Sequence, residues 1–164
     1  MVERGLASTL RAALGRLLHV GARPPRRDRA RPGTRAPRAG RPSYAPRADG
    51  LPDPGEVVWT WVPYEDDPAR GKDRPVLVLA LEGADVVGLM LTSKDHDRVP
   101  GQDRHGRVWL DVGSGAWDPR GRPSEVRLDR LLRLPAADVR REGAALDPRR
   151  YAEVVAAAGP LHGW

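Results

Sequence analysis

Five short apolar segments separated by turn residues most constrain the fold of this chain. They are GEVVWTWVPY (55–64), RPVLVLAL (74–81), ADVVGLMLTS (84–93), GRVWLDVG (106–113) and SEVRLDRLLRL (124–134). Such short segments, rich in β-branched and aromatic residues, are typical of strands. Because no helical pattern lies between them, we expect a mainly β fold, built as a small antiparallel sheet or barrel.

The end of the sequence predicts a C-terminal helix. Asp147 is a favourable N-cap, Pro148 suits the first helical position, and Gly159 is a typical terminator. We therefore expect a helix over residues 147–159, packed on the sheet. With 164 residues, the chain is long enough for one domain with a real core, but not comfortably for two.

The first 21 residues have the pattern of an amphipathic helix, with leucines at helical spacing: Leu6, Leu10, Leu14, Leu17 and Leu18. Arg11 and Arg16 interrupt the apolar stretch, unlike the core of a secretory signal. A basic amphipathic helix can lie on a membrane surface or dock on a partner. It can equally be an extension without function, and the pattern does not discriminate between these readings.

Residues 22–50 combine Pro, Arg, Gly and Ala with almost nothing to bury, so we expect a disordered linker. Residues 1–50 hold 12 of the 28 basic residues and 3 of the 22 acidic ones, so the remaining chain is slightly acidic. The linker could tether RNA or anionic lipid. The predicted organisation is thus a helix (1–21), a linker (22–50) and a β domain (51–164).

Composition bounds the chemistry and the location. The chain has no cysteine, which excludes a disulfide framework and a thiolate metal site. The run Asp95-His96-Asp97 is a poor metal site, because three adjacent residues do not converge on one ion. No apolar stretch approaches the length needed to span a bilayer. We expect no metal, no cofactor and a cytoplasmic protein, with membrane association through the N-terminal helix as an alternative.

Polar groups interrupt the β pattern at three points. Arg74 begins the second segment, Thr92-Ser93-Lys94 ends the third, and Arg127 and Asp129 share one face of the fifth. Arg, Thr, Ser and Lys are residues that hold phosphate, and Arg does so with a planar fork.

Each group also has a structural alternative. Arg74 could pair with Asp73 or with acids of the preceding loop, and Thr92 and Ser93 could cap a turn. Asp129 could simply pair with Arg127 or Arg130.

These motifs, in this order and spacing, resemble the MazF/PemK/Kid family of toxin-antitoxin endoribonucleases. The resemblance covers about residues 54–158, and four motifs carry it: Gly55-Glu56-Val57-Val58-Trp59, Arg74-Pro75 with its apolar run, Thr92-Ser93, and Val126-Arg127-Leu128-Asp129. It implies an SH3-like barrel with a C-terminal helix, a homodimer and an antitoxin partner. It further implies metal-independent cleavage of single-stranded RNA, in which the substrate's own 2′-hydroxyl is the nucleophile.

Carried over residue by residue, the resemblance gives roles to named positions. Arg74 and Thr92 match the catalytic arginine and threonine, and Ser93 is a phosphate contact. Arg127 and Asp129 match the Arg-x-Asp pair that some members use as acid and base. Lys94 and His96 are further candidates for substrate contacts.

The loop before Arg74 departs from the family pattern. Family members usually carry a Gly-x-Glu-Gln-x-Gly-like loop there, whereas residues 65–73 hold four acids and no Gln. Two other functions remain open at this stage, because a fold does not fix a function. One is a catalytically silent regulator that binds RNA or DNA, and the other is a membrane-tethered interaction module.

Overall fold

The structure is a computed structural model that describes residues 40–94, 103 and 105–164. The helix expected over residues 1–21, most of the linker expected over 22–50, and His96 lie outside the described residues. The elements are β1 (Glu56–Pro63), β2 (Gly71–Glu82), β3 (Asp85–Thr92), β4 (Trp109–Gly113), β5 (Ser124–Pro135), a 3-10 turn η1 (Ala136–Asp138), β6 (Arg141–Ala145) and α1 (Pro148–His162).

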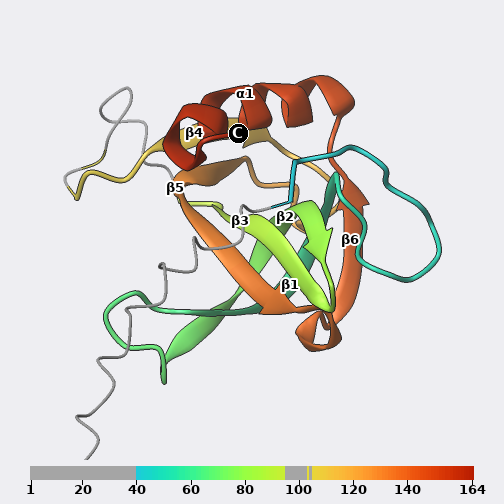
Figure 1. Cartoon of the computed structure of the whole chain (residues 1–164), viewed down its shortest axis with the longest axis horizontal. Coiled ribbons are helices and arrows are strands. Elements are labelled where there is room, and N and C mark those ends of the chain that lie inside the picture. Colours follow the sequence, from blue (N-terminus) through green and yellow to red (C-terminus); the bar gives the residue numbers. More distant parts are fainter. Residues whose placement is uncertain (1–39, 95–102, 104) are drawn as a thin grey trace, which may run out of the picture. The chain divides into compact units, whose positions relative to one another are not determined.

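The six strands form one antiparallel sheet in the order β4-β5-β3-β2-β1-β6 (Figure 1). The expectation of a mainly β fold is confirmed, with the five predicted segments forming β1 to β5. The sixth strand was not predicted, because its sequence REGAA lacks the β-branched and aromatic residues that mark a strand. It pairs with the outer edge of β1, where Glu56 lies opposite Ala145.

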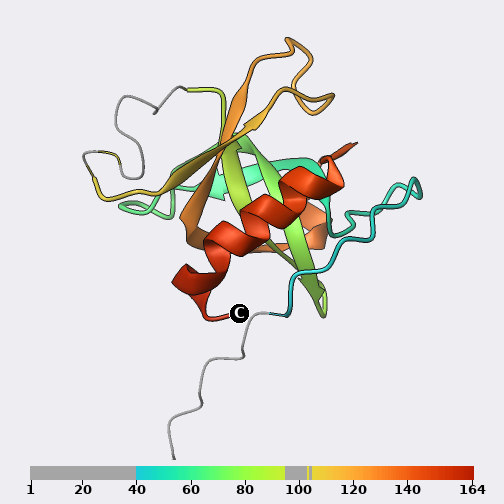
Figure 2. The ribbon, with the colours of Figure 1, turned by 90° about the horizontal axis from the view of Figure 1, so that it is seen from above.

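The curved sheet has a core on each face, which explains why β2 and β3 are apolar on both sides. Figure 2 shows α1 lying across one face. The first core lies under this helix and includes Leu77, Leu79, Leu89, Leu91, Val126, Leu128, Tyr151 and Val154. The second core is formed by Val58, Val62, Val76, Val78, Val86, Met90, Leu132 and Leu134.

Helix α1 begins as the sequence predicts and ends later. The Asp147 carboxylate accepts hydrogen bonds from the backbone N–H groups of Arg149 and Arg150, as an N-cap does. The helix continues through Gly159 to His162, and its C-cap, Gly163, adopts the left-handed conformation (φ 76°). Within the described residues, no helix has the length and apolar character needed to cross a membrane.

Residues 40–50, which the sequence assigned to the linker, make specific contacts with the domain. We call them the N-terminal arm. The Ser43 N–H donates to Leu79 O (3.1 Å), and the Tyr44 hydroxyl donates to Leu146 O (2.8 Å). The Tyr151 hydroxyl of α1 donates in turn to Ser43 O (2.5 Å). The N-terminal arm is therefore held against β2 and the start of α1.

Candidate functional site

Two neighbouring cavities share Arg74 in their walls. The first, of about 380 Å³, is lined by Val62, Pro63, Tyr64, Glu65, Asp66, Arg74, Met90, Arg107, Arg127 and Arg130. The second, of about 400 Å³, is lined by Trp59, Lys72, Asp73, Arg74, Pro75, Leu91, Thr92, Ser93, Lys94, Asp118, Arg122 and Ser124. Val62 and Met90 belong to the second core, so the first cavity opens beside the core that α1 does not cover.

The second cavity brings together Arg74, Thr92, Ser93 and Lys94, four of the residues that the sequence singled out. The antiparallel pairing of β2 with β3 explains this, because it places Val76 opposite Met90. Two residues further along, the same register puts Arg74 beside Thr92. Residues 18 positions apart in the chain therefore meet at one end of two adjacent strands.

Thr92 is buried, with 9% of its surface exposed, whereas Ser93 and Lys94 are exposed. Its hydroxyl oxygen accepts a hydrogen bond from the Lys94 N–H (3.2 Å), as in a turn. Because a hydroxyl both accepts and donates, this bond leaves the Thr92 O–H free to donate into the cavity. The turn-capping alternative and a ligand contact are thus compatible at Thr92.

The guanidinium of Arg74 is not neutralised by the acids that the sequence offered as partners. Asp73 lines the second cavity with Arg74 but pairs with Arg140, and Glu65 binds other arginines. Across the part of the chain that the structure describes, no carboxylate lies within ion-pair distance of Arg74. Its half-buried side chain therefore presents a positive charge to both cavities.

Arg127 and Asp129 lie where β5 changes its pairing. Leu91 of β3 lies opposite Val126, but Leu89 lies opposite Leu131, so four residues of β5 face a single residue of β3. Bulges of this kind bend a strand and redirect its side chains. The bulge explains how a continuous strand places Arg127 and Arg130 in the wall of the same cavity.

Arg127 is buried, with 6% of its surface exposed, and binds two carboxylates. Its Nη1 and Nη2 donate to the two oxygens of Glu65 (2.8 and 2.9 Å), and its Nε and Nη2 donate to Asp129 (3.1 and 2.7 Å). Asp129 also accepts from the Val108 N–H (2.9 Å). Of the two structural partners considered for Asp129, Arg127 and Arg130, the structure shows Arg127, whose guanidinium is enclosed by Asp129 and Glu65.

The pKa values of these groups reflect the pairing. Burial alone would lower the pKa of Arg127, but the hydrogen bonds to Asp129 and Glu65 outweigh burial and raise it. Burial would raise the pKa of Asp129, but the hydrogen bonds that its carboxylate accepts from Arg127 and from the Val108 N–H lower the pKa overall. The hydrogen bond from Arg127 lowers the pKa of Glu65. All three groups are therefore charged at neutral pH.

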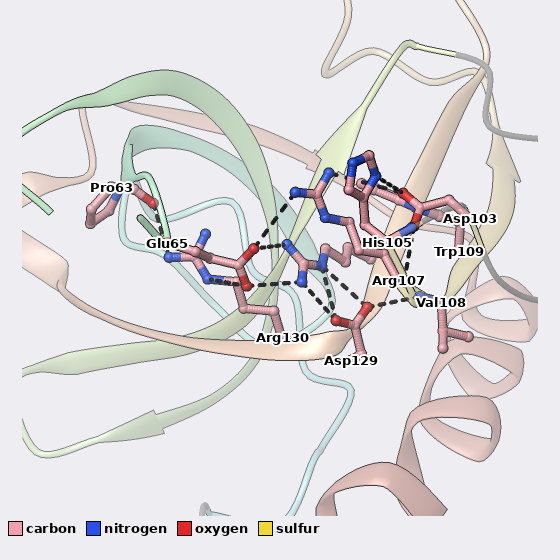
Figure 3. A network of polar contacts seen from close by, with 10 residues as sticks. Pro63, Glu65, Asp103, His105, Arg107, Val108, Trp109, Asp129 and Arg130 are labelled. Carbon is pink, nitrogen blue, oxygen red and sulfur yellow. Dashed lines mark hydrogen bonds and ion pairs between the residues drawn. The ribbon is translucent and has the colours of Figure 1, made fainter. Parts of the chain in front are cut away.

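Glu65, Arg107 and Arg130 join the site without having been singled out by the sequence. Figure 3 shows the Glu65 carboxylate facing Arg107 and Arg130. The nearest atoms are Arg107 Nη2 (3.9 Å) and Arg130 Nε (3.7 Å), and Arg130 also donates to Pro63 O (2.9 Å). No local sequence signal indicates this cluster, because Glu65 and Arg127 are 62 residues apart and meet only in the folded domain.

Asp103 fixes the loop that presents Arg107. Its carboxylate accepts from the backbone N–H groups of His105 (2.8 Å) and Arg107 (3.0 Å). Burial alone would raise the pKa of Asp103, but these hydrogen bonds, with one from Trp109 Nε1, lower it to about 2.

Among the described residues, no cluster of His, Asp and Glu side chains is arranged to hold a metal ion.

The comparisons with known proteins define the class. Residues 53–160 match the model of the family described as PemK-like, MazF-like toxin of type II toxin-antitoxin system. The match spans more than half of the sequence, and the chain belongs to this family of toxins. A comparison with curated proteins found no match.

Solved structures agree with the observed fold. MazF (Form-I) from Deinococcus radiodurans is 23% identical with a TM-score of 0.52, covering 71% of this chain and 100% of that one. The MazE-MazF complex (Form-II) from the same organism contains a chain that is 24% identical with a TM-score of 0.50, covering 70% of this chain and 98% of that one. At these identities the likeness shows the shared fold: a mainly β domain with a C-terminal helix.

Proposed function

We propose that this toxin is an endoribonuclease that cleaves single-stranded RNA without a metal ion, using the substrate's 2′-hydroxyl as the nucleophile. One observation carries the proposal. Arg74 and Thr92 meet at one cavity, and within the described residues Arg74 has no carboxylate to neutralise it. Family membership supports the reaction class.

Cleavage of this kind needs three functions around the scissile phosphate. A base removes the 2′-hydroxyl proton, O2′ attacks phosphorus, and the bond to the 5′-oxygen breaks to leave a 2′,3′-cyclic phosphate. The 5′-oxygen then takes a proton. A cation placed at the developing phosphorane charge lowers the barrier most.

We assign the cation to Arg74, because its guanidinium is charged at any accessible pH and can hold two phosphate oxygens at once. The Thr92 hydroxyl donates a hydrogen bond to a phosphate oxygen, and Ser93 and Lys94 contact the RNA backbone from the rim of the second cavity. These four residues act on one phosphate.

We assign proton transfer to the Arg127–Asp129 pair. Asp129 is ionised at neutral pH, so it is in the form that accepts a proton. Its lowered pKa makes it a weak base while Arg127 holds it, so this role requires the pair to loosen when substrate binds. His96, outside the described residues, remains a candidate for contact with the substrate.

The proposed partners are an antitoxin protein and a second copy of this chain. A solved relative is a MazE-MazF complex, and the two edges of the described sheet, β4 and β6, are available for assembly. The membrane-tethered alternative depends on residues 1–21, outside the described residues, and no other observation favours it. Acting on RNA with an antitoxin, the toxin would function in the cytoplasm.

The test is cleavage of a long, weakly structured RNA in EDTA by the full chain and by Arg74→Ala. Loss of one electrostatic contact of this kind reduces the rate by about 10²–10³. Arg149→Ala is the matched control, because this exposed arginine lies on α1, away from both cavities. Equal activity of the wild type and Arg74→Ala would refute the assignment, and binding without cleavage by the wild type would favour the silent regulator.

A further inference from the structure

The first cavity is lined by four arginines and two carboxylates, so its walls carry an excess of positive charge. Such a cavity is suited to an anion. The protein supplies one anion from its own chain, because the Glu65 carboxylate lies among Arg107, Arg127 and Arg130 (Figure 3).

The contact between Glu65 and Arg127 has the geometry that arginine uses for phosphate. Two parallel N–H donors of Arg127 reach the two carboxylate oxygens at 2.8 and 2.9 Å. A phosphate group accepts the same pair of hydrogen bonds from the same edge of a guanidinium. Glu65 thus occupies a position that a phosphate would fill.

Glu65 balances the arginines together with Asp129, which binds Arg127, and Asp103, which lies 3.9 Å from Arg107, but Arg130 has no carboxylate of its own besides Glu65 among the described residues. Burial lowers the pKa of Arg130, and the charges of Arg127, Arg107 and Arg74 lower it further against the opposing effect of Glu65. The guanidinium groups therefore still repel one another with Glu65 in place. An anion with more than one charged oxygen would relieve this repulsion better than one carboxylate.

Glu65 is also placed so that it can leave. Its side chain is 43% exposed, whereas the side chain of Arg127 is 7% exposed, so the carboxylate covers the buried guanidinium from the solvent side. Glu65 lies on the loop between β1 and β2, so its carboxylate can leave Arg127 without displacing a strand. Exchange of the carboxylate for another anion requires movement of this loop alone.

We propose that Arg107, Arg127 and Arg130 form a binding site for a phosphate group of single-stranded nucleic acid, and that Glu65 occupies this site until a phosphate displaces it. The nucleic-acid ligand rests on the proposed function. Arg74 lines both cavities, so an RNA molecule with its scissile phosphate in the second cavity would place a neighbouring phosphate in the first. The acidic loop is then an internal competitor of the substrate.

The test compares Glu65→Gln with Asp66→Asn in the full chain. Both substitutions remove one negative charge from the same loop and the same cavity, but Asp66 makes no ion pair with a described residue. The probes are inorganic phosphate, followed by calorimetry at low salt, and a fluorescent oligonucleotide of 2′-deoxy sugars, followed by anisotropy. We expect Glu65→Gln to bind both probes about tenfold more tightly than the wild type, the order of one charge-assisted hydrogen-bonded contact.

Asp66→Asn should change either affinity by less than about twofold, because an unpaired exposed charge is screened. Equal effects of the two variants, or no gain in Glu65→Gln, would overturn the inference. Tighter binding of the oligonucleotide but not of inorganic phosphate would also count against a phosphate site.

A measurement on the wild type covers the case in which Glu65→Gln does not fold. Addition of inorganic phosphate should shift the Nε–Hε NMR signals of Arg107, Arg127 and Arg130 together, and unchanged signals would refute the site. Neither measurement involves RNA cleavage. Phosphate binding by a protein that does not cleave RNA would therefore reject the proposed reaction alone, while RNA cleavage with no effect of Glu65→Gln would reject this inference alone.

Discussion

Replacing Tyr44 with alanine should destabilise the domain, although Tyr44 lies outside the residues matched by the family model. The ring packs against Tyr151, with centroids 5.2 Å apart, and its hydroxyl donates to Leu146 O. It also covers Gly55, where a Cβ atom would lie 2.6 Å from the ring. One side chain of the arm thus contacts the residue before β1, the carbonyl before the α1 cap and α1 itself.

The expected loss follows from these contacts. Tyr44 is 37% exposed, so it keeps roughly 100 Å² out of water, which contributes about 2.5 kcal/mol. The hydrogen bond to Leu146 adds about 1 kcal/mol. Allowing for partial burial in the unfolded chain, Tyr44→Ala should lower the free energy of unfolding by about 3 kcal/mol.

The assay is urea unfolding followed by tryptophan fluorescence, since all five tryptophans lie in residues 59–164. With a slope of about 2 kcal/mol per M, the midpoint should fall by about 1.5 M. Tyr44→Phe should lose only about 1 kcal/mol, the part due to the hydrogen bond. Leu51→Ala is the control, because this side chain is 64% exposed and should matter little. If Tyr44→Ala unfolds at the wild-type midpoint, the arm does not contribute to the fold.

Three further predictions concern other parts of the chain. The pKa of Asp103 in the folded protein, about 2, lies below its ordinary 3.8, so the ionised carboxylate stabilises the fold above about pH 4 and this contribution is lost toward pH 2. In Asp103→Asn, the free energy of unfolding should depend less on pH between about 4 and 2, as followed by circular dichroism in acid titrations. Gly88→Ala should lower the free energy of unfolding by about 1–3 kcal/mol, because a Cβ atom there would lie 2.5 Å from Leu77 O. A urea midpoint equal to that of the wild type would show that β2 and β3 can accommodate the methyl group without cost. Removing residues 1–39, which hold ten arginines and two acids, should weaken RNA binding mainly at low salt, and an affinity unchanged at every salt concentration would exclude an electrostatic role.

The local pattern of the sequence was sufficient for most of the sheet and for half of the candidate site. Segments rich in β-branched and apolar residues predicted β1 to β5, because such side chains pack well on the pleated, buried surface of a sheet. Pro75 indicated where the buried part of β2 begins, and simple antiparallel pairing then brings Arg74 to Thr92. Both residues are positioned by regular strands, which is why a sequence pattern could find them.

The other half of the site depends on irregular features that a local pattern does not encode. In β5, Val126 and Leu128 enter the first core while Leu132 and Leu134 enter the second, so the strand exchanges its faces at the bulge. This exchange is decided by packing on β3, not by alternation within the strand. Glu65 and Arg127 are 62 residues apart and meet only because a loop folds over the bulge.

β6 and the arm were missed for a related reason. The sequence of β6 has weak strand propensity, and pairing with the free edge of β1 decides its conformation. Residues 40–50 have the composition of a linker, yet Tyr44 and the backbone of Ser43 find partners on the folded domain. Tertiary contacts override composition at both places.

The most direct test of the proposed reaction is the chemistry of the products. Cleavage of a long RNA first locates the scissile nucleotide, and a short oligoribonucleotide containing that position is then incubated with the full chain in EDTA. The account predicts a 2′,3′-cyclic phosphate on the upstream product, read by mass spectrometry, and no cleavage when the scissile nucleotide alone carries a 2′-deoxy sugar. Cleavage of the deoxy substrate at the same rate would contradict the account, because the nucleophile would then not be the 2′-hydroxyl.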